Sequence, residues 1–182
     1  MKETRLRIRF FGDPALRSKS IPVKHITEEH RQVLSQMAQL MYDGGGIGLA
    51  AAQVGINEDM IVVDIGSGLY KLINPKVTDK SGTQVLEEGC LSIPGICIKV
   101  KRADKVLVKA QDEYGKEFEI ASDGLLACVL QHEIDHLKGK LVIDYASFWE
   151  KIKIKKKLEE LKQRIEDEKL PESERKSCQL QL

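Results

Sequence analysis

The chain has 182 residues, of which 42% are hydrophobic and 31% charged, and its formal net charge is +1. This composition is typical of a globular protein with one core. The small net charge gives no global field that would attract DNA or a membrane surface. The charged start, MKETRLRIRF, lacks the apolar core of a signal peptide, and no apolar run is long enough to span a bilayer. We therefore expect a cytoplasmic protein.

The first two thirds of the chain are predicted to combine an arm, a helix and, in the middle of the chain, strands. Residues 1–26 contain turn signals at FGDPALR and SIPV. A helix is predicted from about 28 to 42, because apolar residues recur at helical spacing after Thr27 and the run ends at three glycines. The β-rich runs MIVVDI and YKLINP predict two strands, and KVLVKAQD and EFEIA predict a hairpin around EYGK.

Two more helices are predicted in the C-terminal half. One runs from about 123 to 138, with Gly139 as its stop, and the other begins at the capping box formed by Ser147 and Glu150. We expect an α+β fold in which antiparallel β-sheets pack around the 123–138 helix, with an N-terminal and a C-terminal helix at the two ends.

The stretch QHEIDHL, on the 123–138 helix, carries the pattern H-E-x-x-H. His132 and His136 are four residues apart, so a helix presents both imidazoles on one face, where they can bind one metal ion. Glu133 points about 100° away from His132, beside the ion, where a carboxylate can move protons. The pattern predicts metal-assisted hydrolysis, although two histidines on a solvated helix face would also satisfy it.

A catalytic metal site needs a third protein ligand, and the same helix does not supply it. Cys128 and His136 lie about 12 Å apart along the axis, too far for one tetrahedral ion. Gly139 continues the longer pattern H-E-x-x-H-x-x-G-x-x-H, but Val142 stands where its last histidine would be. The residue types leave two kinds of ligand open: a cysteine upstream or a glutamate downstream, namely Cys90, Cys97, Glu150, Glu159 or Glu160.

Three stretches taken together resemble the signature motifs of bacterial peptide deformylases. They are GIGLAAAQ at 46–53, EEGCLSIPG at 87–95 and QHEIDHL at 131–137, and FGDPALR near the start is also similar to that family. The resemblance covers roughly residues 5–150. One departure is ICIKV after SIPG, where many members carry an arginine or a bulky polar residue, which puts a rim contact to the substrate in doubt but not the metal site.

The resemblance implies a metal ion held by Cys90, His132 and His136. Family members natively favour Fe²⁺ and accept Zn²⁺, Ni²⁺ or Co²⁺. It also implies that the formyl group is removed from the formyl-methionine of newly synthesised polypeptides, which releases formate. Glu133 is then the acid–base group, and the Leu91 backbone N–H and the Gln53 amide stabilise the charge that develops on the formyl oxygen.

The glycine-rich stretch before Gln53 is not a phosphate-binding loop, because it follows a helix and contains no G-K-[ST]. By resemblance, Gly48 contacts the substrate backbone. The pocket for the methionine side chain has four apolar candidates, each of which is as well explained by ordinary core packing: Ile47, Leu86, Leu125 and Val129.

The C-terminal helix is basic at its start, with five lysines between Lys151 and Lys157. A solvated helix face would explain them, and docking on ribosomal RNA is the alternative. We assign residues 1–146 to a catalytic domain, 147–170 to an amphipathic basic helix of that domain and 171–182 to a flexible tail. A zinc peptidase of the H-E-x-x-H type and a non-enzymatic ribosome-binding protein with a structural metal remain the alternative functions.

Overall fold

The computed structural model describes residues 6–167 of the chain. In this range the elements are α1 (Glu28–Asp43), β1 (Gly48–Ala50), β2 (Met60–Val63), β3 (Tyr70–Ser81), β4 (Gln84–Cys90), β5 (Ile93–Arg102), β6 (Lys105–Gln111), β7 (Glu117–Asp123), α2 (Gly124–His136) and α3 (Phe148–Glu166), with short 3₁₀ helices at Pro14–Arg17, Ala51–Val54 and Val142–Tyr145.

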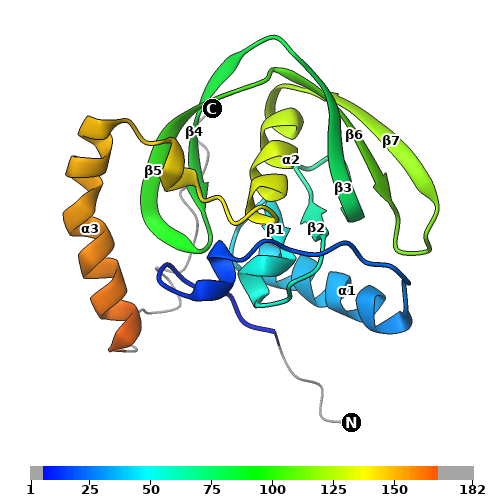
Figure 1. Cartoon of the computed structure of the whole chain (residues 1–182), viewed down its shortest axis with the longest axis horizontal. Coiled ribbons are helices and arrows are strands. Elements are labelled where there is room, and N and C mark those ends of the chain that lie inside the picture. The colour runs from blue at the N-terminus through cyan, green and yellow to red at the C-terminus, as the bar shows by residue number, and fades with distance from the viewer. Residues whose placement is uncertain (1–5, 168–182) are drawn as a thin grey trace.

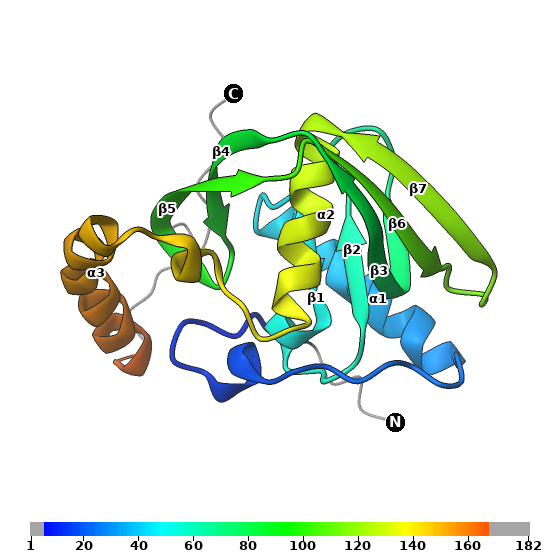
Figure 2. The same cartoon turned by 45° about the horizontal axis from the view of Figure 1, so that its top comes forward.

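The strands form two antiparallel sheets around α2 (Figures 1 and 2). The larger sheet has the order β1-β2-β3-β6-β7, and the smaller sheet is the β4–β5 hairpin. Ala127, Leu130 and Ile134 of α2 pack in one cluster with the inward side chains of the larger sheet, such as Ile61 and Val108. Because α2 is covered by sheets on several sides, its side chains are mostly buried.

The other two helices cover different parts of the molecule. Leu34, Met37 and Met41 of α1 are fully buried in a second cluster with Met60 and Val62 of β2. Helix α3 lies apart from the larger sheet, at the side of the β4–β5 hairpin (Figure 1). It packs through its one stripe of apolar residues into a third cluster: Ile154, Leu158, Leu161 and Ile165.

The α+β architecture predicted from the sequence is confirmed, including the hairpin of β6 and β7 and the capping box at Ser147, which accepts from the Glu150 N–H at 3.3 Å. Strand β3 continues six residues beyond the predicted run, to Ser81. Apart from the partly buried Val77, that extension is polar and exposed, so its sequence shows no apolar alternation. Strands β1 and β4 were not predicted, and α2 ends at His136, shortly before the predicted boundary.

No helix within residues 6–167 is long and apolar enough to cross a membrane. The tail assigned to 171–182 lies outside the described residues.

Candidate metal centre

The three expected ligands meet at one point. Cys90 ends β4, whereas His132 and His136 lie one turn apart on α2. The Nε2 atoms of the two histidines are 3.2 Å apart, and the Cys90 Sγ lies 3.4 Å from the His136 Nε2. All three residues are largely buried, and the His132 side chain is 11% exposed. Nitrogen and sulfur donor atoms that converge in this way are placed to share one common partner.

The spacing of these donor atoms fits a single metal ion. Bonds of 2.0–2.1 Å to nitrogen and 2.3 Å to sulfur in a tetrahedron separate two nitrogens by about 3.3 Å and nitrogen from sulfur by about 3.6 Å. The observed separations of 3.2 and 3.4 Å lie close to these values. One thiolate and two imidazoles suit Fe²⁺, Zn²⁺, Co²⁺ or Ni²⁺ better than Mg²⁺ or Ca²⁺. The residues present therefore fit the metal that the sequence motif predicts.

Cys128 contributes no ligand atom, in line with the distance argument from the sequence. It is buried one turn before His132, and its Sγ donates to the Glu88 Oε1 at 3.1 Å. Burial and the neighbouring Glu88 carboxylate raise the pKa of the Cys128 thiol, so it stays protonated.

Glu133 lies beside the metal centre and is 4% exposed. Its Oε2 is buried without a hydrogen-bond partner among the described residues, and burial raises its pKa to about 7. The carboxylate packs against Gly48 of β1, where a Cβ atom would come within 2.8 Å of the Glu133 Cδ. A carboxyl group that titrates near neutral pH is suited to accept and return a proton.

A buried charge network supports His132, and sequence reasoning missed it. The His132 Nδ1 lies 2.8 Å from the Glu88 Oε2, which leaves its Nε2 facing the other ligands. The Arg102 Nε and Nη2 donate to the two oxygens of Glu88, and the Arg102 Nη1 donates to the Asp135 Oδ2 at 2.9 Å. Tyr145 donates to the same Asp135 oxygen at 2.6 Å.

In the metal-free protein, the groups of this network shift one another's pKa values. Burial would raise the pKa of Glu88, but hydrogen bonds from His132 and Arg102 outweigh it and lower that pKa to about 2. Burial would lower the pKa of His132, and hydrogen bonds to Cys90 and Glu88 raise it instead. Burial and the nearby His132 charge lower the pKa of His136. One signal was available in the sequence, since Glu88 shares the inward face of β4 with Cys90.

The two groups expected to stabilise the oxyanion also lie at the centre. The Gln53 side chain is buried, and its Oε1 accepts the Ala50 N–H at 2.8 Å, which fixes the amide orientation. Its Nε2 lies 3.4 Å from the Cys90 Sγ and 3.1 Å from the Ser92 Oγ. Leu91 directly follows Cys90 and is 3% exposed. Both donors are therefore close to the ligand thiol.

Three of the four apolar pocket candidates share one cluster. Ile47, Leu125 and Val129 pack in the cluster that surrounds α2. Leu86 is partly buried on β4, on the same inward strand face as Glu88 and Cys90. Contact with a substrate side chain is not tested by this packing, so the pocket stays a prediction.

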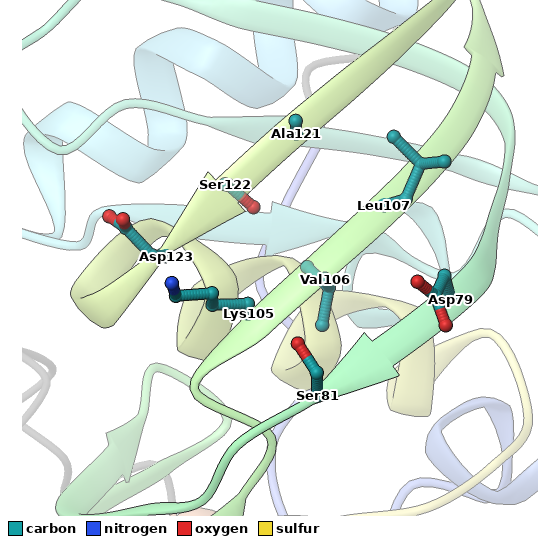
Figure 3. A pocket seen from close by; sticks show the side chains of 8 residues that line it. All are labelled: Asp79, Ser81, Lys105, Val106, Leu107, Ala121, Ser122 and Asp123. Carbon is teal, nitrogen blue, oxygen red and sulfur yellow. The ribbon is translucent and has the colours of Figure 1, made fainter.

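A surface hollow of about 420 Å³ lies elsewhere, over β3, β6 and β7 (Figure 3). Three of its polar side chains, Asp79, Lys105 and Asp123, are exposed, and Lys105 and Asp123 stand at paired positions of β6 and β7. These features are those of an ordinary solvated sheet face, and none of the predicted site residues lines the hollow.

A cysteine and two histidines that converge beside a buried carboxylate form a candidate metal site of the kind found in mononuclear metallohydrolases. The sequence profile of one family, described as "Polypeptide deformylase", matches residues 5–152. The chain is 50% identical over 141 residues to the peptide deformylase of Halothermothrix orenii. The aligned region covers 76% of this chain and 92% of that protein. It is 45% identical over 157 residues to that of Pseudoalteromonas translucida, covering 85% and 94% of the two chains.

A solved structure gives the same result. The crystal structure of a peptide deformylase from Legionella pneumophila superposes with a TM-score of 0.83 at 40% identity, covering 88% of this chain and 97% of that one. The chain belongs to the peptide deformylase family.

Proposed function

We propose that Cys90, His132 and His136 hold one divalent metal ion with which this hydrolase removes the formyl group from N-formylmethionine. The observation that supports this ligand set most strongly is the convergence of the three donor atoms within 4.8 Å of one another. When bound, the ion supplies Lewis-acid polarisation and lowers the pKa of water toward neutrality. Fe²⁺ is the native metal in this proposal, with Zn²⁺, Ni²⁺ and Co²⁺ as substitutes that the same donors accept.

Two groups on the chain act on the developing charge and one acts on the position of the substrate. The Gln53 amide, held by the Ala50 N–H at 2.8 Å, and the Leu91 backbone N–H donate to the formyl oxygen as it becomes negative. Because the Gln53 amide is already oriented before the reaction, it does not have to reorient as the transition state forms. The Gly48 backbone aligns the peptide, since the absence of a side chain there allows a close approach.

Glu133 moves the proton. Its carboxylate is buried next to the ligands and has a pKa of about 7, so it can take a proton from the attacking water at neutral pH. The same group returns that proton to the departing amine, and the products are formate and a free N-terminus. Ile47, Leu86, Leu125 and Val129 line the pocket for the methionine side chain in this proposal.

Two substitutions separate metal binding from proton transfer. Cys90→Ser should lose bound metal, because a hydroxyl is a poor ligand for these ions, whereas Glu133→Ala should keep the metal and lose most of the formate release from a formyl-Met peptide. Cys128→Ser is the matched control for metal content, since Cys128 is a buried cysteine one turn from His132. Full metal content in Cys90→Ser would contradict the ligand assignment, and internal cleavage of unformylated peptides would favour a zinc peptidase.

The identity of the metal needs a separate measurement. Protein purified without oxygen should contain Fe²⁺ and lose activity in air, and reconstitution with Ni²⁺ should restore a rate that air does not destroy. Zinc as the predominant metal in the anaerobic preparation, with full activity, would contradict the iron assignment.

We further propose that the basic start of α3 docks on ribosomal RNA, where formylated nascent chains emerge. The five lysines between Lys151 and Lys157 are all exposed, and the side chains of Lys155 and Lys156 are 76% and 87% exposed. Their ion pairs with glutamates one turn later, at 3.9 and 3.7 Å, are solvated and therefore weak. The lysines are available to neutralise phosphates.

Charge reversal tests this docking better than truncation, because α3 also packs against the core through Leu161. Lys155→Glu with Lys156→Glu should weaken ribosome binding. The affinity should also fall less steeply with salt concentration, because about two phosphate contacts are lost. The control is Lys109→Glu with Lys116→Glu on the β6–β7 hairpin, on the side of the molecule away from α3 (Figure 1). Equal ribosome affinity of the two double variants would refute the docking.

A further inference from the structure

Tyr145 lies at the end of the 3₁₀ helix Val142–Tyr145 and touches both members of a buried ion pair. Its hydroxyl donates to the Asp135 Oδ2 at 2.6 Å, and its ring centroid lies 5.0 Å from the Arg102 Cζ. Arg102 and Asp135 are themselves joined at 2.9 Å. The tyrosine therefore holds the carboxylate through its hydroxyl and the guanidinium through its ring face.

Arg102 connects this pair to the metal centre. Two of its nitrogens donate to the two oxygens of Glu88, a bidentate geometry that fixes the plane of that carboxylate. The Glu88 Oε2 in turn lies 2.8 Å from the His132 Nδ1. A carboxylate on the remote nitrogen of a metal-binding histidine sets its tautomer and ring orientation. The orientation of His132 thus depends on how firmly Arg102 is held.

Tyr145 also separates this network from water. The Arg102 side chain is 5% exposed and the Asp135 side chain 15%, whereas Tyr145 is 38% exposed and forms the outer member of the group. Without its ring, water would reach the guanidinium and compete for its hydrogen bonds. The two hydrogen bonds from Arg102 to Glu88 would then be weaker, because a solvated ion pair is weaker and more mobile than a buried one.

We propose that Tyr145 is a positioning residue of the metal centre, which acts on His132 through the buried charges between them. The proposal rests on the metal site described above. Tyr145 contacts Asp135 and Arg102 and acts on the ligands through them, so its effect is on the strength and geometry of metal binding rather than on a proton-transfer step. Because the chain continues from Tyr145 into α3, this contact also joins the metal helix to the segment that leads to the basic helix.

Co²⁺ binding to the metal-free protein tests the proposal, measured by competition with a chelator and by the visible absorption of the bound ion. Tyr145→Leu removes both the hydroxyl and the ring, and should weaken Co²⁺ affinity about tenfold, the lower end of the range for residues that support ligands, and shift the absorption spectrum. Tyr145→Phe keeps the ring over Arg102. It should therefore retain most of the Co²⁺ affinity and the wild-type spectrum.

Tyr114→Leu is the matched control. Tyr114 also lies over an arginine, with its ring centroid 5.8 Å from the Arg31 Cζ, but it belongs to the β6–β7 hairpin turn and is 76% exposed. This variant should bind Co²⁺ as the wild type does. Urea unfolding of the metal-free proteins measures any general loss of stability in the same set.

The outcomes are distinct. A tenfold loss with a spectral shift in Tyr145→Leu, recovery in Tyr145→Phe and no change in Tyr114→Leu would support the positioning role. Equal affinity and identical spectra for the two leucine variants would overturn it, as would an affinity loss with an unchanged spectrum that Tyr145→Phe does not recover. Failure of the wild type itself to bind Co²⁺ would overturn the metal site and, with it, this inference.

Discussion

Gly48→Ala is expected to lower the activity of the enzyme while leaving its fold and metal intact. Gly48 lies on β1, opposite Glu133, and its φ is not among the positive values in the chain. An alanine there meets no backbone strain, and replacing a strand glycine by alanine at a compatible position stabilises a protein by about 0.4–1 kcal/mol. The effect of the substitution therefore depends on the space that the new methyl group enters.

That space is occupied by the Glu133 carboxylate. A Cβ on Gly48 would lie 2.8 Å from the Glu133 Cδ and 2.9 Å from its Cγ, whereas ordinary contact begins at 3.4 Å. The Glu133 Oε1 would lie closer still, so the carboxylate must move away by more than 0.6 Å, the difference between 2.8 and 3.4 Å for its Cδ. Because a misplacement of 1 Å at a reacting group costs about 10²-fold in rate, we expect kcat/KM to fall by about 10-fold to 10²-fold.

Formate release from a formyl-Met peptide measures the rate, and metal content and urea unfolding are measured on the same samples. Gly45→Ala, in the turn that precedes β1, is the control, since a Cβ there meets nothing within 4 Å, although its φ is +64°. It should lose about 1–2 kcal/mol of stability through backbone strain and keep its activity. Wild-type kcat/KM in Gly48→Ala, or inactivation accompanied by loss of metal, would refute the steric argument.

Two further predictions concern stability. The pKa of Glu88 is lowered from 4.5 to about 2 in the folded state, so its charge stabilises the metal-free protein above about pH 4.5 and this contribution is lost as the pH falls toward 2. Between pH 6 and pH 3 the wild type should lose about 2 kcal/mol more than Glu88→Gln in urea unfolding, and parallel losses would contradict the assigned shift. Leu161, 6% exposed, anchors α3; Leu161→Ala should destabilise the protein by about 2–4 kcal/mol while leaving hydrolysis of a short formyl peptide unchanged. Leu158→Ala, at a partly buried position on the same stripe, should lose less of the free energy of unfolding. An equal loss would contradict the claim that Leu161 is the main anchor of α3.

The local sequence determined the features that depend on short chain distances. The four-residue spacing of His132 and His136 is enough to put both imidazoles on one helix face, because helical geometry repeats every turn. Ser147 and Glu150 likewise fixed the start of α3, and the alternating runs fixed β6 and β7. The three motifs, taken together, also indicated the family. From residue types alone, however, Cys90 was one of several candidate third ligands.

Only the tertiary structure decided which distant side chains meet. Cys90 and His136 are 46 residues apart in the chain, and the antiparallel β4–β5 hairpin brings the end of β4 against α2. The same packing joins Glu88, Arg102, Asp135 and Tyr145 into one network, although no local pattern in the sequence pairs these four residues. Local patterns report propensity and periodicity, whereas a buried ion pair depends on the relative placement of elements, which the packing of the whole core sets.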